Sequence, residues 1–529
     1  MIVSIFNDVI GPVMRGSSSS HCAAALRIGR LACDLMGGEV TDLLVEFDRG
    51  GALPTTHESQ GSDMGLFGGL LGYDAADERL PMSHVALHEA GVNVRIEIVD
   101  THDEHPNTYR LTLRNARESH TLIAISTGGG MMEVIAIDGI RVSIGGDYFE
   151  TLLFAGQKGR EIAQAIAARA TVDEVLVHDS PAGQLVEVRA QAFVGDAVLA
   201  DLGSIAPGLV VKQLAPVLPV LSRGDIRVPF NSCEELLRHD AGRQVPLWQW
   251  AVEYERARGG LSEDEVIERM VEIVRLLRRS IAQGIAGTTY DDRILGHQSG
   301  AFERRMREGG LLDGGSLNRT VLYVSALMEV KSSMGVIVAA PTAGACAALP
   351  AACIAVAEEM NLTEEDMAKG LLAAGLIGVF ITGRWTFAAE VGGCQAEGGS
   401  AAAMAAAALV TLGGGTLSQA AAAASMALQS MLGLICDPVA GRVEVPCLGK
   451  NVLAASNALS CANMALSGFD PVIPFDEVVD AARRVSGQMP RELRCTSLGG
   501  LATTRTAKHL ELRLAGARVN CGPGCGCGH

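Results

Sequence analysis

Apolar and polar residues alternate through much of the first part of the chain. The alternation has a period of two and recurs at residues 43–47, 94–99, 109–113, 122–125, 134–137 and 140–144. This pattern is typical of β-strands with one buried face, and turn residues separate the segments. A helical pattern precedes them at residues 21–36, with Ser20 as its expected N-cap. We therefore expect residues 1–148 to form an α+β domain with a largely antiparallel sheet.

The next segment, residues 149–215, changes rhythm. We expect strand, helix, strand, strand, helix, strand at residues 152–155, 159–169, 172–177, 185–190, 196–204 and 209–214. This βαββαβ order is that of a small ferredoxin-type domain. Many ligand-sensing modules share the fold, so the fold alone does not assign a function.

Helical periodicity dominates residues 225–510. An amphipathic helix is expected at residues 263–283, followed by Ala-rich helices near 319–333, 364–382, 399–411, 416–433 and 449–467. Because alanine is small, such helices can pack with their backbones close together. We expect a mainly α-helical domain here, followed by a tail rich in cysteine and glycine at residues 511–529.

Composition limits the class of protein. The chain has 529 residues, and 60 acidic against 43 basic side chains give a formal net charge of −17. Such a balance disfavours nucleic acid or an anionic membrane as a partner. With 48% apolar residues, the chain can build large cores, which excludes intrinsic disorder for most of its length.

The sequence indicates neither a secretory signal nor a membrane span. The N-terminal apolar run lacks a basic start and is interrupted by Asp8 and Pro12. A cytoplasmic location is the default, so the 13 cysteines are expected as thiols or metal ligands and not as disulfides. Residues 398–436 carry no charge and are rich in alanine. Because alanine is only weakly apolar, we interpret them as two buried helices.

Three cysteines of the helical region lie at unusual positions. Cys394 and Cys447 each come just before a predicted helix, and Cys436 comes just after one. A helix N-terminus favours a thiolate, and soft thiolates bind iron–sulfur clusters or zinc. The spacing matches no compact Cys-x₂-Cys motif, so buried core cysteines are the alternative on spacing alone.

Further candidates lie at a helix start and in glycine-containing turns. Four serines precede the first helix: Ser17, Ser18, Ser19 and Ser20. Hydroxyls and free N–H groups there can bind a carboxylate, with an ordinary helix cap as the alternative. Residues 341–344 can bring backbone against a ligand or merely connect helices. Residues 128–130 are expected to form a tight turn, and His102 and His105 to lie in a solvated turn.

Taken together, these segments resemble the iron–sulfur L-serine dehydratases (L-serine ammonia-lyases), in a single-chain form with both halves fused. The likeness covers nearly the whole chain, in order. In the first part it rests on Gly11-Pro12, the segment from Ser17 to His21, His105-Pro106-Asn107-Thr108 and residues 126–130. In the helical part it rests on Ser333-Met334-Gly335, residues 340–344, Glu390-Val391-Gly392, Cys436-Asp437-Pro438 and Val445-Pro446-Cys447. Residues 149–215 resemble the ACT-type domain of some members.

The resemblance implies a hydro-lyase that converts L-serine to pyruvate and ammonia. It makes Cys394, Cys436 and Cys447 the ligands of a [4Fe–4S] cluster, with no need for pyridoxal phosphate. Three thiolates would leave one iron free to act as a Lewis acid on the β-hydroxyl. The four serines and His21 are the catalytic candidates, and the general base is sought among the hydroxyls and His21.

The remaining expectations concern binding. The candidate substrate-binding residues are Thr342, Gly344, Lys331 and Asp63. The expected partner is a small-molecule substrate, with no nucleic acid and no membrane. The family resemblance also makes a homodimer plausible.

Several positions depart from the family pattern. Gln60 stands where a histidine is typical, and Lys331, Arg384 and Arg442 add positive charge near the presumed site. These cations could bind a second carboxylate, as in a dehydratase of a dicarboxylic β-hydroxy acid such as 2-(hydroxymethyl)glutarate. Alternatively they pair with neighbouring carboxylates: Glu329, Glu390 or Asp437.

Three other hypotheses stay open. The chain could be a non-catalytic amino-acid sensor that works through residues 149–215, or a structural zinc protein that uses the same thiols. A cysteine of the tail could also reach back to the cluster as a fourth ligand. The candidates are Cys521, Cys525 and Cys527.

Overall fold

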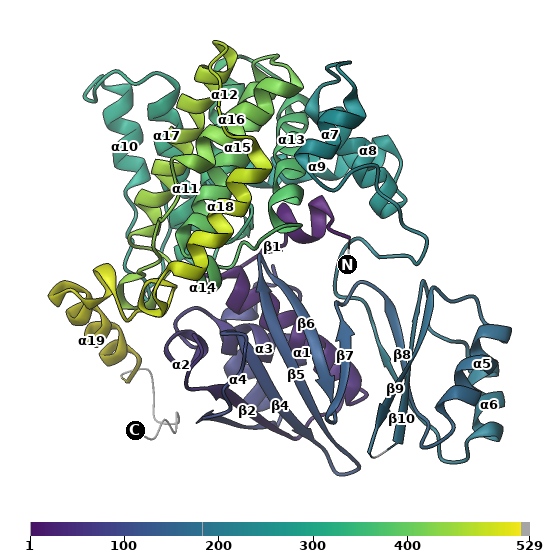
Figure 1. The fold of residues 1–529 in the computed structure, drawn as a ribbon. Coiled ribbons are helices and arrows are strands. Elements are labelled where there is room, and N and C mark those ends of the chain that lie inside the picture. Colours follow the sequence, from purple (N-terminus) through teal and green to yellow (C-terminus); the bar gives the residue numbers. More distant parts are fainter. Residues whose placement is uncertain (1, 182, 520–529) are drawn as a thin grey trace.

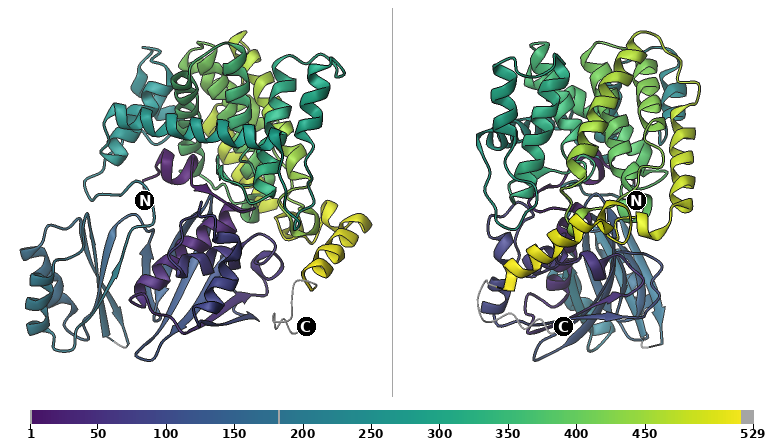
Figure 2. Two further views of the ribbon diagram at one scale, coloured as in Figure 1. Left: turned by 180° about the vertical axis from the view of Figure 1, so that it is seen from behind. Right: turned by 90° about the vertical axis from the view of Figure 1, so that its left-hand side faces the viewer.

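The computed structural model describes residues 2–181 and 183–519. A mainly helical part lies against one end of a β-sheet region, and a smaller sheet flanks that region (Figure 1). The further views show most helices of the C-terminal half on one side of the sheets, while the last helix, Arg505–Val519, lies apart from them (Figure 2). The fold is therefore mixed α/β, with a β-sheet N-terminal region and a helical C-terminal half, as the sequence predicts at this level.

The N-terminal region is built on a six-stranded sheet in the order β3-β2-β4-β5-β6-β7. Its strands are β2 (Asp42–Asp48), β3 (Asn93–Val99), β4 (Thr108–Arg114), β5 (Ser119–Gly128), β6 (Met131–Ile137) and β7 (Ile140–Ile144). The pair β2 and β3 is parallel, and every other neighbouring pair is antiparallel. Inward-facing residues of the strands pack under the first long helix, α1 (Ala24–Leu35), in one core.

Three short helices complete this region: α2 (Leu53–Thr56), α3 (Ser62–Leu70) and α4 (Ser83–Glu89). Helix α3 packs closely on α1 because glycines of α3 meet backbone atoms of α1. The expected tight turn at residues 128–130 joins β5 to β6. His102 and His105 lie between β3 and β4, as expected, and belong to no group of potential metal ligands among the described residues.

The smaller sheet has four antiparallel strands in the order β11-β8-β10-β9. Its elements are β8 (Phe149–Phe154), α5 (Gly159–Arg169), β9 (Glu174–Ser180), β10 (Gly183–Ala190), α6 (Asp196–Ile205) and β11 (Val210–Leu214). Both helices cover one face of the sheet over a separate apolar core (Figure 1). The order of elements is the βαββαβ arrangement, while the likeness to an ACT-type module stays a prediction.

The C-terminal half consists almost entirely of helices. They are α7 (Cys233–Asp240), α8 (Leu247–Gly259), α9 (Glu263–Ala286), α10 (Ser299–Arg307), α11 (Ser316–Ser332), α12 (Ala348–Glu359), α13 (Glu364–Thr382), α14 (Ala389–Gly392), α15 (Ser400–Leu412), α16 (Leu417–Gln429), α17 (Cys447–Leu466), α18 (Phe475–Gln488) and α19 (Arg505–Val519). Helix α15 is almost completely buried among α12, α13, α16 and α17. Its many alanines permit this central position, because small side chains let four neighbours approach.

The uncharged stretch 398–436 forms α15 and α16, which confirms the expected pair of buried helices. Among the described residues, no helix combines the length and the apolarity that crossing a bilayer requires.

The N-terminal segment ties the two parts together. A π-helical turn at Ile5–Val9 lies in the helical core, where Glu255 accepts hydrogen bonds from the Ser4 hydroxyl and the Ile5 backbone N–H. Strand β1 (Val13–Met14) then pairs antiparallel with β12 (Ile337–Val338) of the helical half. The residues that follow β1 and β12 in the chain are the serine run and the 341–344 segment, so this pairing brings them together.

Two local predictions need correction. The first helix does not begin with a Ser20 cap: a π-helical turn, Ser19–Ala23, precedes α1, and Ser18 occupies the N-cap position. Helix α19 continues to Val519, past residue 511, where the tail was expected to begin. The tail cysteines Cys521, Cys525 and Cys527 lie outside the described residues.

Candidate active site

A small enclosed cavity lies where the sheet region meets the helical half. Both parts contribute to its wall: Ser18, Gln60, Ala389, Glu390, Glu397, Cys436, Pro438, Val443, Cys447 and Cys495. Motifs that are far apart in the sequence therefore converge on one space.

The predicted thiols Cys394, Cys436 and Cys447 come from three different local structures. Cys394 precedes a π-helical turn, Gln395–Gly399, Cys436 follows α16 in a loop, and Cys447 is the first residue of α17. The sulfur atoms of Cys394 and Cys436 and a carboxylate oxygen of Glu397 all lie within 4.8 Å of one another. The structure thus brings two of the predicted thiols and a carboxylate to metal-binding distance, with Cys447 on the wall of the same cavity.

Burial of the thiols together disfavours their ionisation. Hydrogen bonds with Cys394 and Cys495, followed by burial, raise the pKa of Cys436, and burial raises the pKa of Cys447. Such a group becomes thiolate only when a cation lies among the sulfur atoms. The donor set of buried, clustered sulfur atoms is the one that an iron–sulfur centre requires.

Lys450 of α17 is a cation beside the thiols. Its ammonium group donates hydrogen bonds to Asp437 Oδ1 at 2.6 Å and to the Ile435 carbonyl at 2.7 Å, and reaches Cys394 Sγ at 3.7 Å. Although burial opposes it, the negative charge of Cys394 and Asp437 raises the pKa of Lys450. Lys450 therefore stays protonated and stabilises negative charge on Cys394.

The serine run approaches the cavity from the sheet region, and all four of its residues are buried. The Ser18 hydroxyl does not cap the helix; it lies 3.0 Å from His21 Nδ1 instead. Ser19 Oγ accepts a hydrogen bond from the Ala343 backbone N–H at 3.1 Å. Of the four serines, Ser18 lies on the cavity wall, directly before the π-helical turn Ser19–Ala23. Turns of this kind often occur at functional sites.

The hydrogen bonds of His21 assign its tautomer. The Thr56 hydroxyl donates to the Ala52 carbonyl at 2.8 Å, so its oxygen accepts from His21 Nε2, 2.9 Å away. The Nε2 atom then carries the ring proton, and Nδ1 offers its lone pair to the Ser18 hydroxyl. Burial, followed by the charge of His57, lowers the pKa of His21 to about 3, which keeps the ring neutral.

Glu390 places a carboxyl group beside this pair. Its Oε1 lies 3.4 Å from His21 Nδ1, and the side chain is buried. Burial, followed by repulsion from Glu397, raises the pKa of Glu390 to about 7. A carboxyl group with this pKa can both accept and return a proton near neutral pH. The arrangement Ser18–His21–Glu390 thus offers a path for a proton out of the cavity.

Thr342 and Gly344 position Glu397. The Thr342 hydroxyl donates to Glu397 Oε1 at 2.7 Å. A Cβ atom at Gly344 would lie only 2.7 Å from the same oxygen, so this close approach requires glycine. The two residues predicted to bind substrate therefore contact a carboxylate that lines the cavity.

The other two predicted binding residues behave differently. Lys331 is fully buried and donates to the carbonyl of Val443, a residue of the cavity wall. Asp63 is not among the cavity residues and pairs with His57 Nδ1 at 2.8 Å.

Arg384 and Arg442 also have carboxylate partners, but not those that the sequence suggested. Arg384 lies beside Asp476 and Asp480 of α18, and Arg442 pairs with Asp292. Their charges are therefore compensated outside the cavity.

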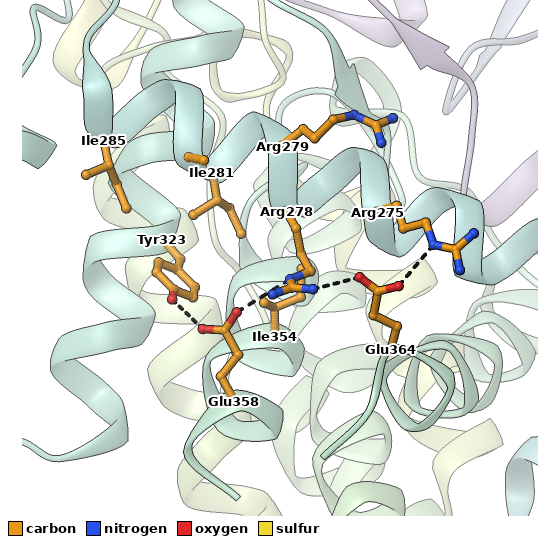
Figure 3. Close-up of a pocket in the computed structure, with 10 residues that line it drawn as sticks. Arg275, Arg278, Arg279, Ile281, Ile285, Tyr323, Ile354, Glu358 and Glu364 are labelled. Atoms are coloured by element: carbon orange, nitrogen blue, oxygen red, sulfur yellow. Dashed lines mark hydrogen bonds and ion pairs between the residues drawn. The ribbon is translucent and has the colours of Figure 1, made fainter. Parts of the chain in front are cut away.

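A larger hollow, of about 450 Å³, lies elsewhere on the helical half, between α9, α11 and α12 (Figure 3). Two of the arginines on its wall are held by carboxylates: Arg275 and Arg278 bind Glu364, and Arg278 also pairs with Glu358. Its lining residues include no thiol, imidazole or serine, unlike those of the smaller cavity.

Sequence reasoning missed Glu397, Gln60, Lys450 and Cys495 as cavity or near-cavity residues. For Glu397 a signal existed, because its spacing of three from Cys394 brings both side chains to one side of a helical turn. Lys450 has the same spacing from Cys447 on α17. No local pattern singles out Cys495, because it lies in a loop between two 3₁₀ turns.

Comparison with known proteins gives a consistent result. The family description "Serine dehydratase alpha chain" matches residues 242–502. The chain is 37% identical to a probable L-serine dehydratase alpha chain of Bacillus subtilis over 290 residues, 55% of this chain and 97% of the relative. It is 31% identical to the probable beta chain of the same organism over 218 residues, 40% of this chain and 98% of the relative.

A single-chain relative extends the likeness to the whole length. The L-serine dehydratase of Helicobacter pylori (strain 26695) is 26% identical over 522 residues, 95% of this chain and 98% of the relative. Alpha-type and beta-type sequences are thus fused in one chain, as the motif order indicates.

Proposed function

Because the chain belongs to the iron–sulfur L-serine dehydratase family, we propose that it eliminates water from L-serine to give pyruvate and ammonia. The observation that carries this proposal is the convergence of buried thiols with the Ser18–His21–Glu390 path on one cavity. The first set suits a metal centre, and the second suits proton transfer. Both are needed to remove a proton and a hydroxyl from neighbouring carbon atoms.

The residues present fit an iron–sulfur cluster, and we propose the [4Fe–4S] type. Cys394, Cys436 and Cys447 would hold it, with Lys450 compensating their negative charge. When bound, such a cluster supplies a Lewis acid that assists departure of the β-hydroxyl.

Ser18 and His21 of the sheet region, together with Glu390 of α14, handle the proton. The Ser18 oxygen lies on the cavity wall and removes the α-proton of the substrate while its own proton passes to His21 Nδ1. The imidazolium is disfavoured by burial, so the proton moves on to Glu390, whose carboxylate lies 3.4 Å from the same nitrogen. Elimination yields aminoacrylate, which tautomerises and hydrolyses to pyruvate and ammonia.

The charge around the cavity favours L-serine over a dicarboxylic substrate. Of the three cations that suggested a second carboxylate, Arg384 and Arg442 are paired with Asp480 and Asp292. Lys331 alone contacts the cavity wall, and one cation suffices for the single carboxylate of serine.

The remaining predictions from the resemblance stay proposals. They are a homodimer, a cytoplasmic location, the ACT-type character of residues 149–215, and the division into domains at residues 1–148, 149–215 and 225–510.

The test is anaerobic purification with iron, sulfide and zinc analysis, followed by an assay of pyruvate formation from L-serine. We expect a brown protein with about four irons per chain and turnover of L-serine in preference to 2-(hydroxymethyl)glutarate. Cys436→Ser should lose colour and activity together, while Cys33→Ala, at a half-buried position of α1 that is not on the cavity wall, should keep both. A colourless zinc protein, or serine binding without turnover, would contradict the proposal.

A further inference from the structure

Thr56, the last residue of α2, contacts His21 at the ring nitrogen that Ser18 does not use. The Thr56 hydroxyl oxygen lies 2.9 Å from His21 Nε2, and the Ser18 hydroxyl lies 3.0 Å from Nδ1. Both ring nitrogens are therefore engaged, and the side chains of Thr56 and His21 are buried. Thr56 is not a residue of the cavity wall, so it can influence the reaction only through His21.

The hydroxyl proton of Thr56 has another acceptor. It points to the Ala52 carbonyl at 2.8 Å, in the bond that threonine commonly forms with the carbonyl four residues earlier. Because a hydroxyl carries one proton, the Thr56 oxygen can only accept from the ring, and His21 Nε2 must donate. The proton of the neutral ring then lies on Nε2, and Nδ1 keeps the lone pair that receives the Ser18 proton.

The turn that carries Thr56 is fixed from both parts of the molecule. The Ala52 backbone N–H donates to the Pro106 carbonyl of the sheet region at 2.9 Å. From the helical half, the Arg491 side chain donates to the Gly51 carbonyl at 3.0 Å. These bonds hold the Ala52 carbonyl in place, so the acceptor of the Thr56 hydroxyl proton is fixed as well.

Glu390 offers the ring proton of His21 a competing position. Its Oε1 lies 3.4 Å from Nδ1, the same nitrogen that the Ser18 hydroxyl contacts. A ring with its proton on Nδ1 would donate to Glu390 and could no longer accept from Ser18. Without the Thr56 oxygen, the buried Nε2–H would have no acceptor among the described residues, and the form with the proton on Nδ1 would be favoured.

We infer that Thr56 is a positioning residue: its hydroxyl oxygen keeps the ring proton of His21 on Nε2 and so makes Nδ1 the acceptor for the Ser18 proton. The inference rests on the proposed function for the roles of Ser18 and His21. The step it governs is a proton relay. The α-proton of the substrate bonds to the Ser18 oxygen as the Ser18 proton passes to Nδ1, and the electron pair of the C–H bond stays with the substrate.

The test uses the full-length holoprotein under anaerobic conditions. Thr56→Val keeps the shape of the side chain without its hydroxyl, and Thr56→Ser keeps the hydroxyl. In Thr56→Val, kcat for L-serine should fall at least ~10-fold while KM and iron content stay unchanged, because a misplaced ring proton impairs only the relay. Thr56→Ser should retain most of kcat. Thr56→Ala is a second variant without the hydroxyl and should behave as Thr56→Val does.

The pH dependence of kcat separates this role from a merely structural one. Burial raises the pKa of Glu390 to about 7, and this group must be ionised to receive the proton, so kcat should rise with pH through that region. In Thr56→Val, a proton on Nδ1 is donated to the Glu390 carboxylate and stabilises its ionised form. The rise in kcat should therefore move to lower pH in this variant and stay in place in Thr56→Ser.

The matched control is Thr55→Val. The Thr55 hydroxyl donates to the same Ala52 carbonyl at 3.1 Å and to the Thr496 carbonyl at 3.2 Å, and not to His21. This variant should keep both kcat and the pH profile. An unchanged kcat or pH profile in Thr56→Val, or an equal loss in Thr56→Ser or Thr55→Val, would overturn the inference and leave the proposed function intact. An unchanged protein that does not turn over L-serine would overturn both.

Discussion

The two parts that meet at the cavity differ in the chemistry they bring. The helical half contributes buried thiols, Glu390 and Glu397, with Lys450 and Lys331 as nearby cations. The sheet region contributes neutral groups: the Ser18 hydroxyl, the His21 ring and the Gln60 amide. The helical half thus carries the charged groups, including the proton acceptor Glu390, and the sheet region passes the proton to it through neutral groups. We therefore expect that a substitution in one part can impair its own function, proton transfer or cofactor binding, and leave the other function intact.

The largest expected effect separates proton transfer from cofactor binding. Ser18→Ala removes the hydroxyl that links the cavity to His21, so kcat/KM for L-serine should fall by about 10- to 100-fold. Iron content should not change, because Ser18 comes from the part that contributes none of the three predicted cluster ligands. Ser83→Ala is the control, since Ser83 is a buried serine that bonds the Met64 carbonyl away from the cavity. Loss of iron in Ser18→Ala would contradict the assignment of Ser18 to proton transfer and not to cluster binding.

The second expected effect is on the pH dependence of stability, and it concerns the smaller sheet. This sheet has no thiol but buries the ionisable side chain of Glu150. Burial, followed by repulsion from Glu187, raises the pKa of Glu150 to about 9, although Arg189 lies nearby. Because the folded-state pKa exceeds the unfolded value, Glu150 stabilises the fold at low pH, and this stability is lost as pH rises toward 9.

Glu150→Gln should therefore flatten the decline in the free energy of unfolding between pH 5 and pH 9, by at least ~1 kcal/mol over that window. Urea unfolding at several pH values measures it, with exposed Glu161→Gln as the control. Parallel pH curves for the unchanged protein and Glu150→Gln would show that the carboxyl is ionised throughout.

The smallest expected effect is a loss of stability at the start of one helix, α13, which we compare with the turn that precedes α1. Thr363 caps α13 in a capping box with Asp366, whereas the Ser18 side chain makes no cap hydrogen bond. Thr363→Ala should cost about 1 kcal/mol of stability and leave kcat unchanged. Ser18→Ala should show the reverse, with a larger loss of kcat than of stability. Thermal unfolding together with the pyruvate assay distinguishes the two cases. A fall in kcat for Thr363→Ala would contradict the expectation that this cap affects stability alone.

Sequence patterns predicted most elements because each depends on nearby residues. The period of two located the six strands of the main sheet, and the helical period located α9, α11, α13, α15, α16 and α17 within a few residues. The start of α1 was wrong, because Ser18 bonds His21 and no cap forms. That choice depends on a tertiary contact which local propensity does not contain.

The site was only partly predictable for the same reason. Motif residues Cys394, Cys436, Cys447 and Ser18 do converge, while Asp63 pairs with His57 instead. The sequence suggested Glu329, Glu390 or Asp437 as partners of the added cations. Arg384 instead lies beside Asp476, and Arg442 pairs with Asp292.

The sequence by itself determined the class of elements, the acidic charge and the set of reactive side chains, since hydrophobic periodicity and residue type are local properties. Only the tertiary structure decided which of these side chains share a cavity. The pairing of β1 with β12 sets the serine run beside residues 341–344, and the pairing of Cys436 with residues 493–495 adds Cys495 to the thiols. Such contacts depend on how whole elements pack, and no short stretch of sequence encodes them.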